Sequence, residues 1–327
     1  MSQKPVLASL ALLVLVASAR PAAAFCQATT CDPTLGSCAT DAQNCLAAGI
    51  PLAWASNCLT VSVQADGAPK QHIDYADAAG SVTRAFEAWT SAPCPGGPPS
   101  MVVHVDGPIT CDASEYNADR GNANIVVFRE DVWPYVGGQD ALGLTRIHFS
   151  PDTGEIYDSD IEVNAVDEPL SVGEPAAKDV DLDSLLTHEA GHLLGLAHNT
   201  IDKTATMYPG YEPGSIELRS LAADDIAGIC TIYPHSRPGA TTSCEPRHGY
   251  SDLCGADQPA PSPEMVQSTT TSGGCSVSLG DSTHGFSIVL ASALASLSLR
   301  RVRRVRRVRR VRRVNPRRAA AAFLRAR

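Results

Sequence analysis

The feature that most constrains this chain is an eleven-residue stretch from His188 to His198, which reads His-Glu-Ala-Gly-His-Leu-Leu-Gly-Leu-Ala-His. Histidines four positions apart project from one face of a helix, about one turn from each other. That separation suits two ligands of one tetrahedral zinc. Gly195 allows a turn with positive φ that ends the helix and brings His198 back as a third ligand. We therefore predict one zinc held by His188, His192 and His198, with an open fourth position.

Glu189 lies between the first two histidines and is the expected catalytic residue. A carboxylate beside an open zinc position can act as the general base that takes a proton from water. The alternative is a degenerate site that holds zinc without turnover, and the presence of Glu189 argues against it.

Met207 follows nine residues beyond His198, in the segment Thr-Met-Tyr-Pro at 206–209. Together with the histidine motif it resembles the signature of the metzincins, in which this methionine forms an apolar floor below the metal ligands. Within that class the chain resembles the matrixins, the matrix-metalloproteinase-like family, and particularly their secreted bacterial members. The resemblance covers about residues 54–234. It implies one catalytic zinc and hydrolysis of a protein or peptide substrate.

The same resemblance implies a specificity pocket. Met-Tyr-Pro-Gly-Tyr at 207–211 is similar to the matrixin wall of the primary specificity pocket, formed here by Pro209 and Tyr211. The chain also departs from the family, because Asn199 stands where matrixins usually have serine. No Pro-Arg-Cys-Gly latency segment precedes the motif, so the latency mechanism stays open.

Hydrophobic periodicity predicts an α+β or mixed α/β domain in which strands and helices are interspersed. The expected strands span 59–63, 101–105, 125–128, 143–149 and 156–163, and the expected helices span 74–89, 181–197 and 220–232. The resemblance implies, in addition, the metzincin α/β sandwich. This has a mainly parallel sheet with an antiparallel edge strand, an active-site helix and a C-terminal helix. The strand at 143–149 is the expected edge strand for pairing with substrate, although a plain sheet edge explains it equally well.

Composition divides the chain into five parts. Residues 1–24 have the charged start, apolar run and small-residue cleavage site of a secretory signal peptide. Residues 25–50 form a Cys-rich N-terminal segment, and 51–237 form the matrixin-like catalytic domain. Residues 238–274 are a Pro/Ser/Thr linker. Residues 275–327 form a C-terminal sorting or membrane segment with an Arg-rich tail.

That last segment joins an apolar run at 285–299 to repeated Arg-Arg-Val from Arg300 onward. A basic cluster directly after an apolar run is typical of a membrane stop. With Gly274-Cys275 before it, the segment resembles the C-terminal sorting signals of myxobacterial surface proteins, which predicts membrane contact and retention at the cell surface or outer envelope. A basic tail that binds nucleic acid is the alternative.

Charge limits the partners of the body between these ends. Residues 25–284 contain 10 basic and 35 acidic residues, a formal charge of −25. Such a surface repels phosphate backbones, so we expect no nucleic acid on the folded body. It favours divalent cations or basic peptides, and we expect a monomer with a protein or peptide substrate.

Export gives the eleven cysteines a structural role. Without Cys275, ten remain, which is enough for five disulfides, but sequence does not fix their connectivity. The pairs favoured by loop length are Cys94 with Cys111, and Cys230 with either Cys244 or Cys254.

Two alternatives stay open from the sequence. Calcium is a second candidate cation, for which Asp152, Asp158, Asp160 and Glu162 supply carboxylate oxygens; a turn and a solvated strand face explain the same residues. The other alternative is that the metzincin fold serves as a cell-surface binding or adhesion module with little or no proteolysis. The intact histidine motif with Glu189 argues against that module.

Overall fold

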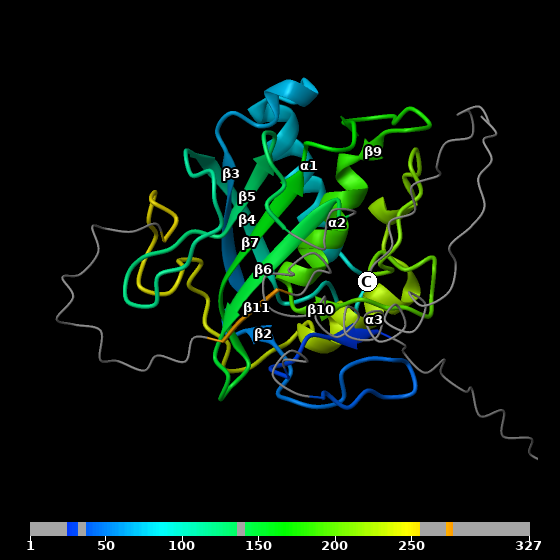
Figure 1. Ribbon diagram of the computed structural model, residues 1–327. Coiled ribbons are helices and arrows are strands. Elements are labelled where there is room, and N and C mark those ends of the chain that lie inside the picture. The colour runs from blue at the N-terminus through cyan, green and yellow to red at the C-terminus, as the bar shows by residue number, and fades with distance from the viewer. Residues whose placement is uncertain (1–24, 32–36, 136–140, 256–272, 277–327) are drawn as a thin grey trace, which may run out of the picture.

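The computed structural model describes four stretches of the chain, drawn in colour in Figure 1. They are residues 25–31, 37–135, 141–255 and 273–276. The predicted signal peptide at 1–24 and nearly all of the predicted tail at 275–327 lie outside the described residues, as do residues 256–272 of the predicted linker. Among the described residues, no helix has the length and apolar content needed to cross a membrane.

A twisted sheet forms the framework. Its strand order is β11-β6-β7-β5-β3-β4, and β2 pairs with β7 off this path. β2, β3, β4, β5 and β7 pair in parallel, whereas β6 is antiparallel to β7. The strands are β2 (Ala53–Trp54), β3 (Cys58–Gln64), β4 (Val102–Ile109), β5 (Ile125–Arg129), β6 (Gly143–Phe149), β7 (Glu155–Asn164) and β11 (Gly273–Ser276). The predicted mainly parallel sheet with an antiparallel strand toward one edge is confirmed.

The three predicted helices are present. They are α1 (Tyr75–Thr90), α2 (Leu182–Leu193) and α3 (Ala223–Ile232). Asp74 caps α1, and Asp181 caps α2 by accepting a hydrogen bond from the backbone N–H of Ser184. The end predicted for the second helix, residue 197, is wrong, because Gly195 takes φ +93° and ends the helical path.

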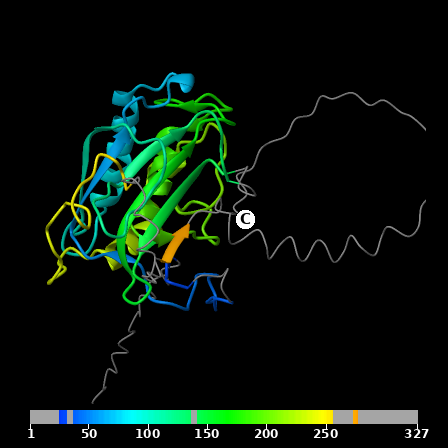
Figure 2. The same cartoon turned by 60° about the vertical axis from the view of Figure 1, so that its left-hand side comes forward.

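Helices α1 and α2 lie together against one face of the sheet, as Figures 1 and 2 show. The main core fills the space between these layers, and its largest fully buried side chains include Trp89, Ile161 and Leu186. Burying each such side chain stabilises the fold by about 1.5–3 kcal/mol. This core holds α2 rigidly against β6 and β7.

The opposite face of the sheet is covered by irregular segments that disulfides hold in place. Cys111–Cys254 adjoins a small second core around Ile125, and Cys58–Cys244 ties residues of the expected linker to β3. Ten cysteines form five bonds: Cys26–Cys45, Cys31–Cys38, Cys58–Cys244, Cys94–Cys230 and Cys111–Cys254. The pairs expected from loop length are therefore wrong. Packing brings together cysteines as far as 186 residues apart, and a criterion based on local loop closure cannot anticipate that.

The strand expected to form the free edge has a neighbour on part of its length. β11 pairs antiparallel with Arg146–Phe149 of β6, beside which Figure 2 draws it in orange. Among the described residues, no strand pairs with Gly143–Thr145 on that side. Those first three residues are thus the part of β6 that is open to an added strand.

Candidate active site

The three histidines of the motif meet at one point. Nε2 of His198 lies 3.1 Å from Nε2 of His188 and 3.1 Å from Nε2 of His192. A tetrahedral zinc with Zn–N bonds of about 2.0–2.1 Å places its ligand atoms about 3.3–3.4 Å apart. The donor set and its spacing therefore fit a single zinc ion.

Backbone carbonyls fix the orientation of two of these rings. Nδ1 of His188 lies 2.7 Å from the carbonyl of Thr206, and Nδ1 of His192 lies 2.9 Å from that of Leu196. Each Nδ1–H donates to its carbonyl, so each Nε2 presents a lone pair toward the common point. Burial lowers the pKa of His188 to about 4 and that of His192 to about 3, which keeps both rings neutral as metal ligands require.

Glu189 directly follows His188 on α2. It is 3% exposed, and its Oε2 accepts a hydrogen bond of 2.6 Å from the hydroxyl of Thr145 on β6. Burial raises the pKa of Glu189 to about 7, while the Thr145 hydrogen bond acts in the opposite direction. A carboxylate that titrates near neutrality is suited to accept a proton and later release it.

Met207 lies below the histidine helix and is 2% exposed. Gly191, inside the motif, gives it room: a Cβ at this position would lie 2.3 Å from Sδ of Met207 and 2.6 Å from the Trp89 ring. Met207 thus packs directly against the backbone of α2 at Gly191, between His188 and His192.

Asp225 on α3 holds the backbone around Met207, which we call the methionine turn. Its two carboxylate oxygens accept from the backbone N–H groups of Thr206 and Met207, at 2.7 and 3.1 Å, and one also accepts from Ala222. The carbonyl of Thr206 orients His188, so Asp225 supports this predicted metal ligand indirectly, through the backbone of Thr206. Sequence reasoning did not single out Asp225 or Thr145, although the Asp-Asp pair at the start of α3 was a usable signal.

Tyr211 is 6% exposed and joins the loop after the methionine turn to the start of α2. Its hydroxyl accepts from the backbone N–H of Asp181 at 2.8 Å and donates to the carbonyl of Ser215 at 2.7 Å. Pro209 is partly exposed in the same loop. The two residues predicted to form the pocket wall therefore lie on one segment between the metal point and α3.

Asn199, the departure from the matrixin pattern, is 1% exposed. It forms hydrogen bonds through its backbone N–H and through both polar atoms of its side chain. Its backbone N–H donates to the carbonyl of Met207 at 2.9 Å, and its side-chain amide donates to Asp224. Its side-chain oxygen accepts from the backbone of Ile201. Asn199 thus fastens the chain directly after His198 to the methionine turn.

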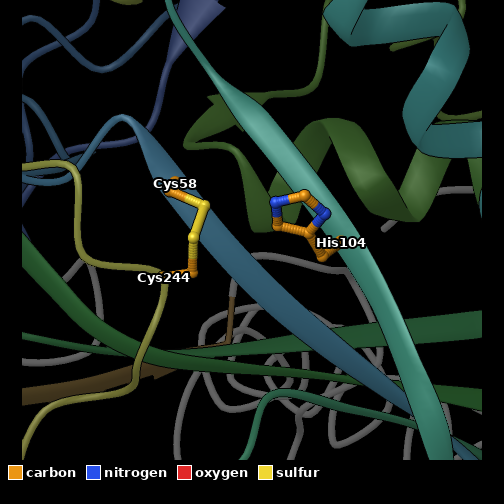
Figure 3. Close-up of side chains that lie close together, drawn as sticks. All are labelled: Cys58, His104 and Cys244. Atoms are coloured by element: carbon orange, nitrogen blue, oxygen red, sulfur yellow. A yellow bond between two sulfur atoms is a disulfide. The ribbon is translucent and has the colours of Figure 1, made fainter.

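A second group with metal-ligating atoms consists of Cys58, His104 and Cys244, shown in Figure 3. Its two sulfurs form a disulfide, so they offer no thiolate. His104 is exposed beside it. Of these two groups, the histidine cluster is therefore the one whose donor atoms are free to converge on a metal.

A mainly parallel sheet, a histidine helix ended by a glycine turn and a buried methionine below it are the features expected of a metzincin domain. Comparison with known proteins narrows the class: residues 103–234 match the matrixin family of peptidases. This part of the chain is similar to a matrixin domain, and the matrixin family is zinc-dependent.

Several curated relatives align with part of the chain. It is 34% identical over 152 residues to Metalloendoproteinase 1-MMP of Arabidopsis thaliana, covering 46% of this chain and 36% of that protein. It is 29% identical over 164 residues to Metalloendoproteinase 1 of Glycine max, covering 47% and 44%. It is 38% identical over 103 residues to Matrilysin of Mus musculus, covering 32% and 36%. The chain thus spans less than half the length of each of these relatives.

Proposed function

We propose that this protein is a zinc-dependent endopeptidase that hydrolyses peptide bonds in protein or peptide substrates. The observation that carries the proposal is the convergence of three neutral histidine Nε2 atoms, two of them 3.1 Å from the third, with the buried Glu189 directly after His188 on α2. The matrixin match and the metalloendoproteinase relatives support it. A metzincin-fold binding module would not require a buried carboxylate at this position.

In this mechanism His188, His192 and His198 would hold the zinc. Bound there, the ion would supply Lewis acidity toward the scissile carbonyl and the attacking water. Glu189 takes the proton from that water and passes it to the leaving amine. Met207 acts by packing below the histidines, and Pro209 with Tyr211 forms one wall of the pocket for the substrate side chain.

The substrate backbone would lie along the first residues of β6. Gly143–Thr145 has no strand partner on its outer side among the described residues, so an extended peptide can add there by β-augmentation. The acidic body favours basic segments around the cleavage site.

The test is cleavage of a peptide library by the purified full chain, with and without a zinc chelator, alongside elemental analysis of protein prepared without added metal. We expect about one zinc per chain and cleavage that the chelator abolishes. Zinc content near zero that titration does not restore would overturn the metal assignment. Zinc without cleavage of any peptide would favour the binding module.

We propose a second cation, calcium, at the acidic row on the far face of β7. Among the residues that the structure describes, both carboxylate oxygens of Asp158 and one of Asp160 are buried without a hydrogen-bond partner, and both residues are 1% exposed or less. Glu162 is instead engaged by Arg129 and Tyr135, and Asp152 is exposed in a turn. The candidate site therefore narrows to Asp158 and Asp160. Calcium titration by calorimetry tests it, with Asp158→Asn as the disabled variant and Asp152→Asn as the matched control.

We also propose that the protein is exported and retained at the cell surface through residues 275–327. Five disulfides support an oxidising compartment. Fractionation of cells producing the full chain, a truncated chain and Cys275→Ala tests the retention. We expect the truncated form to escape to the medium, and identical distribution of all three forms would overturn a role of the tail in delivery.

A further inference from the structure

The carboxylate of Glu189 reaches across from α2 to β6, an element 44 residues away in sequence. There the hydroxyl of Thr145 lies 2.6 Å from Oε2 of Glu189 and 3.2 Å from its backbone carbonyl. Thr145 is 0% exposed. Side chain and backbone of the same glutamate are therefore both within reach of one buried hydroxyl.

Gly143 contacts the other oxygen of the same carboxylate. A Cβ at this position would lie 2.6 Å from Oε1 of Glu189 and 2.9 Å from its carboxyl carbon. Real Cβ atoms essentially never approach another heavy atom so closely, so any side chain here would displace the carboxylate. Gly143 and Thr145 are two residues apart on a strand and thus face the same side of β6.

We propose that Gly143 and Thr145 form a seat that fixes the carboxylate of Glu189 in its working position, with Thr145 as a positioning residue for the general base. The inference rests on the proposed peptidase function. Thr145 restrains one carboxylate oxygen by a hydrogen bond, and the missing side chain of Gly143 leaves space for the other. A buried carboxylate with a single hydroxyl donor is free to rotate once that donor is removed.

The position of the seat on β6 gives it a further consequence. The same three residues, Gly143–Thr145, form the open stretch of β6 on which the proposed substrate backbone would pair. One strand, β6, would then position both the substrate backbone and the carboxylate of the general base. A shift of about 1 Å between base and reacting group can cost about a hundredfold in rate, so a shared strand is an effective way to hold them in register.

The first test compares Thr145→Val with Thr145→Ser. Valine keeps the shape of threonine and removes the donor, whereas serine keeps the donor. We expect Thr145→Val to lower kcat by about 10- to 100-fold with KM changed less than threefold, and Thr145→Ser to stay within threefold of wild type. Thr60→Val is the matched control, because Thr60 lies on β3 and its hydroxyl bonds to the carbonyl of Cys244. It should leave both constants within twofold.

Gly143→Ala tests the other half of the seat. The added methyl should lower kcat at least tenfold by displacing the carboxylate, while KM stays within threefold. It also keeps the proposal testable should Thr145→Val fail to fold. Wild-type kcat in Gly143→Ala, or in Thr145→Val, would overturn the seat, and so would a Thr145→Ser variant as slow as Thr145→Val.

A measurement independent of turnover completes the design. Zinc content should stay at the wild-type level in every variant, because the seat does not touch the histidines. In thermal unfolding, Thr145→Val should lower Tm more in the wild-type background than in a Glu189→Ala background, where its main partner is gone. Equal loss in both backgrounds would make Thr145 a general packing residue and overturn the proposal. Absence of cleavage by wild-type protein would instead count against the peptidase function, and this thermal cycle would still test the seat.

Discussion

The two faces of the sheet bury polar side chains in contrasting ways. On the helix side, His188 and His192 each have one ring nitrogen tied to a carbonyl, and Glu189 has a hydroxyl donor. On the opposite face, within the described part of the chain, Asp158 has no hydrogen-bond partner on either carboxylate oxygen and Asp160 has one oxygen without a partner. Both groups sit in low-dielectric surroundings, where an unpaired polar group is costly.

This contrast shows how the histidines on one face and the carboxylates on the other can each remain buried. The helix-side histidines are neutral and oriented, so their remaining lone pairs converge on one point and need only a cation to be satisfied. The carboxylates of the far face must bind either a proton or a cation, because burial raises the pKa of Asp160 to about 8 and raises that of Asp158 well above its usual range. Arg129 and Tyr135 satisfy the third acid of the row, Glu162.

The largest effect is expected at the general base. Glu189→Ala should lower kcat/KM by about 10³-fold or more, since it removes the group that transfers the proton. Zinc content and the circular dichroism spectrum should stay unchanged. Glu212→Ala, at an exposed position, is the matched control. Activity of Glu189→Ala within tenfold of wild type would show that the helix-side group does not work through its carboxylate.

Zinc removal should have the next largest effect, and it separates the two faces directly. If zinc is present at about a thousand times its dissociation constant, its removal lowers the free energy of unfolding by about 4 kcal/mol. Without zinc, the Nε2 lone pairs of three neutral histidines face one another with no cation between them. Calorimetry with a chelator selective for zinc over calcium measures it, and re-addition of zinc should restore Tm. An unchanged Tm would mean that the histidines hold no metal in the folded chain.

Met207 tests the packing below the histidines. Met207→Ser should lower the free energy of unfolding by about 2–4 kcal/mol, because it opens a cavity beside Trp89 and buries a hydroxyl. The zinc should keep nitrogen ligands only, as X-ray absorption can show. Sulfur coordination in the wild type would contradict the role of Met207 as a packing residue.

The smallest effect is expected on the far face, and it depends on pH. Because the pKa values of Asp158 and Asp160 are higher in the folded than in the unfolded chain, protonation favours the folded state. The contribution of Asp160 is therefore fully present below pH about 4 and is lost as the pH rises toward 8, and that of Asp158 is lost in the same direction. Asp158→Asn should flatten the fall in Tm between pH 5 and 8, without calcium, by a few degrees. Asp152→Asn should not, and a variant curve parallel to wild type would exclude this titration.

Calcium sharpens the same comparison. If the cation binds at Asp158 and Asp160, its addition at pH 8 should raise the Tm of the wild type and leave that of Asp158→Asn unchanged. An equal rise in both proteins would place calcium elsewhere.

Much of the helix-side group could be read from the sequence because its parts lie within one short segment. His188, Glu189 and His192 share a helix, and Gly195 fixes the turn to His198, so helical geometry alone brings them near one another. The positions of the helices followed equally from local patterns, whereas the antiparallel strand β6 was expected from the family resemblance. Gly195 also explains why α2 ends at Leu193, four residues before the expected end.

Contacts between distant segments could not be read in this way. Thr145 meets Glu189, and Asp225 holds Met207, only because the core packs β6 and α3 against the histidine helix and its loop. The disulfides show the same limit, since Cys94 bonds to Cys230 across 136 residues rather than to its nearer neighbour.

The sequence by itself determined the chemistry: which side chains can bind a metal, which carboxylate lies beside it, and which glycine lets the chain turn. These features depend on the residue types and on the 3.6-residue period of the helix, both of which are set within a few consecutive residues. Tertiary structure alone decided which hydroxyl supports Glu189, which carboxylates are buried without partners and which cysteines pair. Those depend on long-range packing of the core, where many weak contacts summed over the whole domain select one arrangement that no local segment specifies.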